Sequence, residues 1–508
     1  MPVIRDRISK RGLLMALAMA VPASAADWKK AETRHFVIYS DGSTSQLEDY
    51  AIQLEKFDAL LRLVFGRPAS EQPTRLRIYL LRSMGQVEDL RGRNIAGFYS
   101  PRVEGSYAVS NREANDRGLR TLFHEYAHHF MFNNFGIPAP AWFVEGFAEY
   151  VSTTEFKSNG EWIFGYPQKD RAYSVNNGQK IPIEALLTTD VSEIRDGGAF
   201  YGWSWALTHM LYSDPKKRGD QIQAYLREIN SGTENLEAAR RHFGDLAELE
   251  SNLRRYVRGS MGYSKSDLTL AYAQDIRITD LSSYEGELVE LTLERIARYE
   301  PEATRDKLRS LAERGEGTAE SWYQLAEIEF ALNHKEEAGY DFSAAEAAVD
   351  RALALDGNHV RANLLKGRLL LEPFDHGDDP DPANWAAARE YIGKANRLDP
   401  ADPLALYDFA NSYLREGASH PQMTDALKMA FSLAPEAAEV RFAYATQLAR
   451  EGRYDDAIFL LKVLANNPHG DRGAKAVIEA LTKARDSGGV ASIRFEPSEE
   501  EDESTGDE

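Results

Sequence analysis

The sequence predicts an α+β domain, built from a small mixed sheet and several helices, followed by an all-α solenoid. Segments with strand and helix periodicity alternate over residues 26–116, which is typical of a mixed sheet covered by helices. Residues 316–485 instead carry only helical patterns, which recur with a period of about 34–40 residues. The length of 508 residues agrees with more than one unit, because a domain takes about 150 residues.

The N-terminus has the parts of a secretory signal peptide. Four basic residues lie within the first eleven positions, and the apolar run that follows over residues 12–21 is too short to span a bilayer. Ala23-Ser24-Ala25 is an A-x-A cleavage site, so we expect residues 1–25 to be removed. These features predict a bacterial periplasmic or secreted protein with no membrane span in the mature chain.

The composition excludes several kinds of ligand. The chain has 80 acidic and 60 basic residues and a formal net charge of −20, so nucleic acid and anionic membrane surfaces are not expected partners. It has no cysteine, which excludes disulfides, thiolate metal ligands and a lipoprotein anchor. A metal site in this chain must therefore use nitrogen and oxygen donors.

The first domain, expected over residues 26–260, begins with alternating strands and helices. A long helix over residues 43–65 has an apolar face, and Asp41 and Ser43 are candidates to cap its first turn. Asn159-Gly160 is a strong hairpin signal between two short strands. The strands expected in this domain span residues 35–40, 74–81, 97–100, 106–110, 153–156 and 162–164.

The segment His124-Glu125-Tyr126-Ala127-His128 is an H-E-x-x-H motif inside a helical pattern. Two histidines four positions apart lie on one face of a helix, so both imidazoles can reach one metal ion. Glu125 sits beside the first histidine, where it can take a proton from a metal-bound water without being a ligand. A polar helix face can match so short a motif by chance. A catalytic zinc site takes three protein ligands, so a third one is still to be found.

Glu145, which follows His128 by 17 positions, is the candidate third ligand. The interval allows the first helix to end near Gly136 and a second helix to return across the metal. Glu149 lies one helical turn beyond Glu145 and can accept the N–H of a ligating histidine, which fixes the tautomer of that ring. The alternative for both glutamates is a solvated pair on a helix face. Two histidines and one glutamate make Zn²⁺ the expected metal.

The segments H-E-Y-A-H and W-F-V-E-G-F-A-E-Y resemble those of the gluzincin metallopeptidases, and those of the bacterial peptidase MA-like group in particular. The resemblance covers residues 30–260. It implies that His124, His128 and Glu145 bind zinc and that Glu125 is the catalytic base. Aminopeptidases of this class carry a G-x-M-E-N segment upstream, which is not found before His124 in this chain, so aminopeptidase specificity is not implied.

The same resemblance implies two further features of the site. In gluzincins a strand just before the active-site helix edges the cleft, so an extended peptide can pair with a strand in the region of residues 97–110; the alternative is an ordinary covered edge strand. A tyrosine or histidine near the metal commonly binds the oxyanion, and Tyr201 is the candidate here. The alternative for Tyr201 is an aromatic core stripe shared with Trp203 and Trp205, and His209 is expected to be a core or surface residue rather than a ligand.

The second half of the chain divides into a helical bridge over residues 261–315, a repeat domain over 316–485 and an acidic, disordered tail over 486–508. The repeat units resemble tetratricopeptide (TPR) repeats, which implies a concave face that binds a protein or peptide partner, or a packing platform for the first domain. The acidic stretch over 373–380 is interpreted as a loop. Four units end alike, at residues 352–357, 395–400, 430–435 and 464–468.

Two functions fit these observations. The first is a zinc-dependent peptidase, in which metal-activated water hydrolyses a peptide bond and the repeats bind protein or peptide. The second is a periplasmic TPR scaffold or adaptor whose metal site is structural or vestigial. Glu125 favours the first, because a purely structural site has no use for a base.

Overall fold

The fold is taken from a computed structural model of the chain. The expected signal peptide and the acidic tail from residue 489 onward lie outside the residues that the structure describes, as does most of the loop over 373–380. The described residues are 27–68, 74–93, 95–112, 116–189, 197–213, 218–315, 317–333, 340–375, 382–465 and 472–488.

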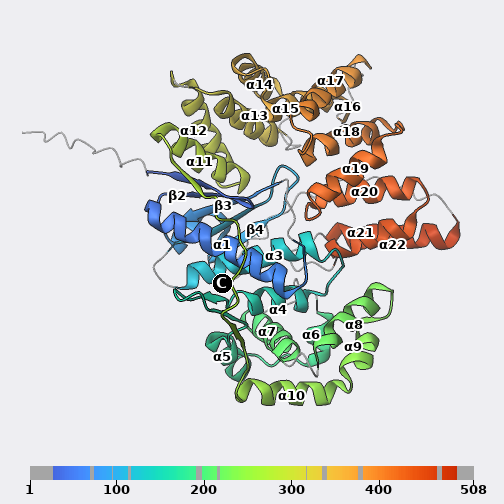
Figure 1. The fold of residues 1–508 in the computed structure, drawn as a ribbon. Coiled ribbons are helices and arrows are strands. Elements are labelled where there is room, and N and C mark those ends of the chain that lie inside the picture. The colour runs from blue at the N-terminus through green and yellow to red at the C-terminus, as the bar shows by residue number, and fades with distance from the viewer. Residues whose placement is uncertain are drawn as a thin grey trace, which may run out of the picture.

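A mixed six-stranded sheet lies at the centre of the N-terminal region (Figure 1). The spatial order is β4-β5-β3-β2-β1-β9, with parallel pairing of β2 with β3 and of β3 with β5, and antiparallel pairing elsewhere. Strand β4 is therefore an edge strand. The strands are β1 (Lys29–Glu32), β2 (Phe36–Ser40), β3 (Leu76–Leu81), β4 (Gly97–Ser100), β5 (Tyr107–Asn111) and β9 (Arg277–Asp280).

Both faces of this sheet are covered by helices, as the alternation of β3 shows. Ile78 and Leu80 pack into the main core with α1 (Thr44–Val64) and α3 (Asp116–Asn134). Tyr79 and Leu81 face the other way, toward α2 (Met84–Arg91) and α11 (Ser283–Ile296). The predicted cap is confirmed for Ser43, whose side chain accepts the N–H of Gln46.

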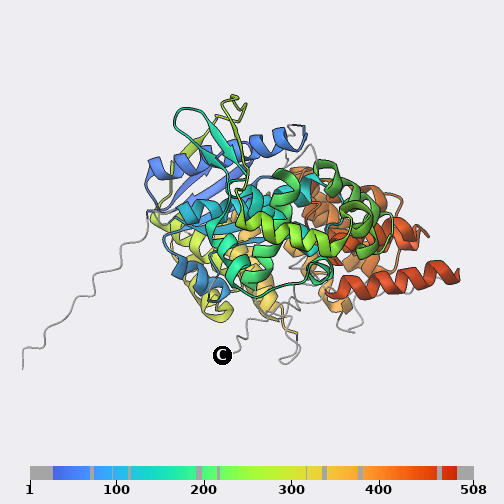
Figure 2. The same ribbon diagram turned by 90° about the horizontal axis from the view of Figure 1, so that it is seen from below.

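A helical layer follows the sheet and carries a small second sheet, in the order β6-β7-β8. Figure 1 shows these helices below the six-stranded sheet, and in Figure 2 the β6–β7 hairpin projects from the body of the domain. The elements are α4 (Ala141–Val151), β6 (Glu155–Phe156), β7 (Trp162–Phe164), α5 (Lys169–Asn177), α6 (Ile183–Thr188), α7 (Gly197–Ser213), α8 (Gly219–Asn230), α9 (Asn235–Phe243), α10 (Leu246–Arg258) and β8 (Ser264–Ser266).

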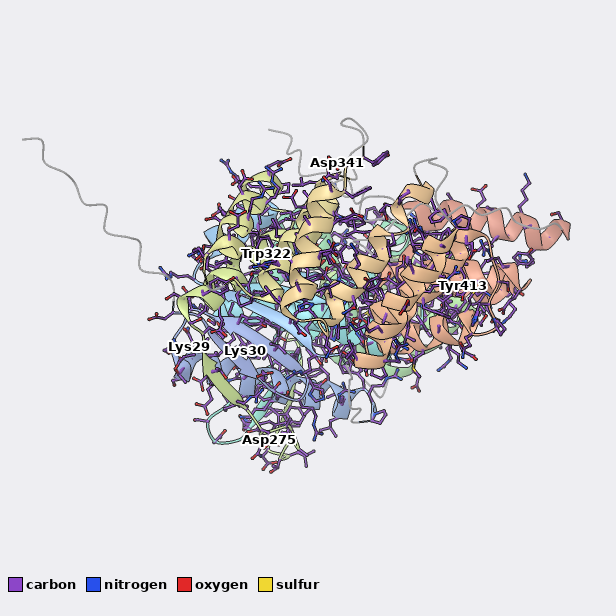
Figure 3. All side chains as sticks on the ribbon, turned by 90° about the horizontal axis from the view of Figure 1, so that it is seen from above. Lys29, Lys30, Asp275, Trp322, Asp341 and Tyr413 are labelled. Carbon is purple, nitrogen blue, oxygen red and sulfur yellow. The ribbon has the colours of Figure 1, made fainter. Side chains whose placement is uncertain are left out.

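Helices then continue to the end of the described chain and pair as α13 with α14, α15 with α17, α18 with α19 and α20 with α21. The first helices of successive pairs also touch one another, so α13, α15, α18 and α20 form one layer, which we call the inner layer. Figure 1 shows the array curving around one side of the sheet, and Figure 3 places Trp322 on α13 and Tyr413 on α18. The helices are α12 (Pro301–Glu313), α13 (Ala319–Asn333), α14 (Ser343–Leu355), α15 (Val360–Leu369), α16 (Glu372–Asp375), α17 (Ala383–Leu398), α18 (Pro403–Glu416), α19 (Met423–Leu433), α20 (Ala438–Arg450), α21 (Tyr454–Ala465) and α22 (Arg472–Ser487).

Beyond the elements that the sequence predicted, the structure contains β1, α2, α5 and α6, and the segment expected as a helical bridge also contributes β8 and β9. Strand β9 pairs with β1, and β8 pairs with β7, so this segment completes both sheets of the N-terminal region. Among the described residues, no helix combines the length and the apolar character that a bilayer crossing requires.

Candidate metal centre

Glu145 lies at the middle of a helix that is buried along its whole length. Helix α4 packs between α3, which carries the H-E-x-x-H segment, and α7. The approach to α7 requires a glycine at position 146, because a Cβ there would lie 2.4 Å from the carbonyl oxygen of Ser204. Glu145 consequently has no exposed area and is fixed against α3.

Three side chains, two from α3 and one from α4, converge on one point. The Nε2 atoms of His124 and His128 are 3.1 Å apart, and Oε2 of Glu145 lies 3.4 Å from the first and 3.7 Å from the second. Zinc–nitrogen bonds of about 2.0–2.1 Å in a tetrahedral site place neighbouring donors about 3.3 Å apart. The three donor atoms therefore fit one small cation, and they form a group that can hold a metal ion.

Negative charge dominates the surroundings of His124. Burial alone would lower the pKa of its imidazole, but the hydrogen bond to Glu145 and the charges of Glu149 and Glu125 outweigh burial and raise that pKa to about 9. An imidazole in such a field binds positive charge strongly, whether a proton or a metal ion. The centre is thus suited to a divalent cation.

Glu149 lies beside the ring of His124 and is held there by Gln168 and Arg171. Its Oε1 lies 3.5 Å from Nδ1 of His124, while Oε2 accepts hydrogen bonds from Nε2 of Gln168 and Nε of Arg171, both at 3.0 Å. A second guanidinium nitrogen of Arg171 donates to Oε1, so the pair is bidentate. Burial would raise the pKa of Glu149, but the charges of Arg171 and His124 and these hydrogen bonds lower it. Glu149 therefore stays ionised and lies beside Nδ1 of His124.

Glu125 is half-buried and lies beside the edge strand β4. The strand approaches closely because residue 97 is glycine: a Cβ there would lie 2.6 Å from Cγ2 of Thr121 and 3.7 Å from Cγ of Glu125. Further along β4, the hydroxyl of Tyr99 hydrogen-bonds to Nδ1 of His129 at 3.0 Å. Burial lowers the pKa of His129 to about 3, so the neutral ring accepts this bond. Strand β4 thus lies directly against the helix that carries the H-E-x-x-H segment.

Tyr201 of α7 lies at the centre, and the two tryptophans that follow it do not. Its ring centroid is 6.4 Å from that of His124, and the guanidinium of Arg171 lies 5.4 Å from the Tyr201 ring. The charge of Glu145, together with burial, raises the pKa of its hydroxyl, which remains protonated and able to donate. Trp203 and Trp205 are buried in the core.

His209, which also lies on α7, is a core residue, as the sequence analysis expected. One ring nitrogen hydrogen-bonds to the hydroxyl of Tyr256 at 2.7 Å, and the other to the carbonyl oxygen of Gly165 at 2.9 Å. Burial lowers its pKa to about 4, so the ring is neutral. Both nitrogens are engaged away from the metal centre, and His209 is not part of it.

The sequence analysis missed Gln168 and Arg171, which anchor Glu149. Both come from the first turn of α5 and its preceding residue, and α5 packs against α7. Arg171 also stacks on Tyr201, so it links two candidate site residues. Only the tertiary packing of α5 identifies them, since an arginine in a polar helix carries no signal of its own.

No known protein family and no curated protein matches the chain in sequence. Among solved structures, similarity is found to a TPR protein from Thermus thermophilus (17% identity, 39% of this chain, 99% of that chain, TM-score 0.34) and to MamA from Desulfovibrio magneticus (18%, 40%, 98%, TM-score 0.26). PilF of Pseudomonas aeruginosa is a third (17%, 41%, 87%, TM-score 0.32). At these TM-scores the matches carry no functional inference for this chain, and the candidate function depends on the centre itself.

Proposed function

We propose that this chain is an exported zinc-dependent peptidase that acts on extended peptide or protein segments. The observation that carries the proposal is the convergence of His124, His128 and Glu145 on one point, with Glu125 one residue from a ligand and adjacent to an edge strand. Two imidazoles, one carboxylate and a separate carboxylate base are the set that metal-assisted hydrolysis needs.

The residues around the centre divide the chemistry among them. A divalent cation at the centre supplies Lewis acidity, which polarises a carbonyl and lowers the pKa of bound water toward about 7. Glu125 accepts a proton from the attacking water and delivers it to the departing amine. The hydroxyl of Tyr201 donates to the carbonyl oxygen of the substrate as negative charge develops there. Glu149, fixed by Arg171, holds the orientation of His124.

The substrate is proposed to bind by strand addition to β4. Within the described ranges β4 pairs with β5 alone, so its outer edge has backbone donors and acceptors for another strand. A peptide bound there runs past Glu125, because Gly97 of this strand faces Thr121 and Glu125. In this arrangement the protein binds the backbone of a peptide and not its free amine. Such binding favours cleavage at internal bonds of unfolded segments.

The test is peptide hydrolysis by the zinc-loaded protein and by its Glu125→Gln variant. We expect the variant to keep its metal and to lose about 10²–10⁴-fold in kcat, which is the usual contribution of a general base. Glu161→Gln, which alters a half-buried carboxylate that pairs with the exposed Lys265, is the matched control and should be fully active. Full activity of Glu125→Gln, or no cleavage of a mixed peptide library by the zinc-loaded native protein, would contradict the proposal.

A further inference from the structure

The turn between β4 and β5, residues 101–106, is enclosed by the inner layer of the repeat array. We call this segment the β4–β5 turn. Val103 at its centre is only 6% exposed and belongs to an apolar cluster supplied mainly by the repeats. Burial of apolar area favours this contact. The residues around it include Leu364 of α15, Leu404 and Ala405 of α18, and Val440 of α20.

Three arginines from three elements hold the tip of this turn. Arg295 of α11 donates to Oε1 of Glu104 at 2.6 Å, and Arg361 of α15 donates to the backbone oxygen of Glu104 at 2.9 Å. From the sheet itself, Arg77 of β3 donates to the backbone oxygen of Gly105 at 2.6 Å. Burial would raise the pKa of Glu104, but the charges of Arg295, Arg77 and Arg361 hold it well below its usual range. The turn thus presents a fixed negative charge to a positive surface.

A second contact connects the array to α3. The hydroxyl of Ser106 donates to Oε1 of Glu436, just before α20, at 2.7 Å, and both residues are buried. The side chain of Asn133 on α3 also lies near Glu436 and partly offsets the rise that burial gives to the pKa of this carboxyl group. Asn133 in turn donates to the backbone oxygen of His129, whose ring bonds to Tyr99 of β4. The repeats therefore touch both the turn that follows β4 and the helix that carries the metal centre.

Strand β4 needs such support. It has four residues and one strand partner, and edges of this kind open locally at low free-energy cost. One end of β4 packs on Thr121 and Glu125, and the other leads directly into the held turn. An edge that is already ordered binds an added strand at lower entropic cost than one that must be ordered on binding.

Resting on the proposed function, we propose that the repeat array is an internal clamp on the β4–β5 turn, and that Glu104 and Arg361 are positioning residues that set strand β4 beside Glu125 for an extended substrate. The clamp uses one face of the inner layer. The sequence analysis left open whether the repeats bind a partner or form a packing platform for the first domain. The first occupant of this part of the face is thus the chain's own turn, and any peptide directed there must displace it.

The test compares hydrogen exchange and kinetics of the native protein with those of Glu104→Gln, which keeps the shape of the side chain and removes its charge. We expect exchange of the amides of residues 97–106 to become about tenfold faster or more. For an extended peptide we expect KM to rise about fivefold, with a smaller change in kcat and unchanged zinc content. Glu104→Asp, which keeps the charge, should restore most of the native exchange rate and KM.

Two further variants keep the test decisive. Arg361→Gln removes the donor to the backbone of the turn, together with a charge that pairs with Asp402. It should give the same two effects even if Glu104→Gln does not fold. Glu184→Gln alters an exposed carboxylate that pairs with Arg240 at 2.8 Å, and it should change neither readout.

Native exchange of residues 97–106 in folded Glu104→Gln and Arg361→Gln would overturn the clamp. Faster exchange with an unchanged KM would overturn the positioning role. If the native protein cleaves no peptide, the proposed function fails, and the exchange rates alone still decide whether the array clamps the turn.

Discussion

Two clusters of buried charge in this protein are built from the same kinds of side chain and differ in their balance. At the metal centre, Glu125, Glu145 and Glu149 surround two histidines, and Arg171 is the permanent positive charge that contacts Glu149. At the β4–β5 turn, both carboxylates lie beside arginines: Arg295 binds the Glu104 carboxylate, Arg361 lies 3.2 Å from Asp402, and Arg77 adds a third positive charge near Glu104.

The difference teaches what each cluster is for. A buried charge is stable only when it is paired and hydrogen-bonded, so the balanced cluster at the turn is complete as it stands. The metal centre carries more negative than positive charge, and its donor atoms converge on one point instead of pairing off. Such an arrangement is completed by a cation from outside the chain. The cluster at the turn therefore joins two parts of the protein, and the metal centre has donor atoms that could hold a metal ion.

The largest effect should come from removing a donor at the centre. We expect His128→Ala to weaken zinc binding by at least about 100-fold, since zinc binding by a full ligand set is worth roughly 10–16 kcal/mol. The measurement is zinc affinity by competition with a chelator, followed by elemental analysis. His242→Asn, which removes a histidine on α9 that pairs with Glu228, is the control. Equal zinc affinity in His128→Ala and the native protein would contradict the view that this cluster, unlike the one at the turn, binds a cation.

A smaller effect is expected from the arginine that serves the centre indirectly. Arg171→Met leaves Glu149 without its bidentate partner, so His124 loses its fixed orientation. We expect zinc affinity to fall about 10–100-fold, the range typical of residues that support a ligand. Arg171→Lys keeps the charge without the planar guanidinium, and its zinc affinity should lie between those of the native protein and Arg171→Met. An unchanged affinity in Arg171→Met would show that Glu149 orients His124 without help.

The charged residues at the β4–β5 turn should show a favourable coupling free energy with one another. In a double-mutant cycle, Glu104→Gln and Arg295→Met are each expected to destabilise the protein, and the double variant to be less destabilised than the sum. The coupling free energy should be about 1–3 kcal/mol in urea unfolding, as for buried charged partners in contact. If the two losses of stability simply add, Glu104 and Arg295 do not stabilise each other. That result would contradict the interpretation that the charges of this cluster are satisfied within the protein.

The smallest effect concerns a third buried group, His35, which bonds to Glu55 at 2.8 Å beneath α3. Burial would lower the pKa of His35, but the hydrogen bond to Glu55 and the charge of Asp58 raise it above the ordinary value of about 6.5. A raised folded pKa gives stability that is fully present below about pH 6.5 and is lost as pH rises through the folded value. The free energy of unfolding measured in urea should fall more over this window for the native protein than for His35→Gln. Parallel pH profiles of this free energy would contradict the prediction.

Much of the fold was accessible from local sequence signals. The helix capped by Ser43, the two strands around Asn159-Gly160, and the helix pair that carries the centre all lie where periodicity and turn residues predict them. The missed strands β8 and β9 are short and polar, and mostly exposed, so they have no alternating pattern to detect. Their strand form comes from pairing with β7 and β1, which are distant in sequence.

The candidate site divides in the same way. His124 and His128 could be predicted as one pair and Glu145 and Glu149 as another, because helix geometry places residues four positions apart on one face. The structure brings the two pairs together. For Arg171 the relevant contact depends on how α5 packs. The Glu104 cluster joins residues almost 200 positions apart, and no local pattern encodes such a contact.

The pairing of β1 with β9 has a consequence for the order in which the chain can fold during synthesis. Lys29 pairs with Asp280, so about 250 residues must follow β1 before its second neighbour exists. At about 5–20 residues per second this takes roughly 12–50 s, during which β1 can act as an open sheet edge. Lys29 and Lys30 lie on that strand (Figure 3), and lysine on an open edge opposes pairing with other chains. The two lysines thus disfavour strand pairing with other chains as long as β9 is not in place.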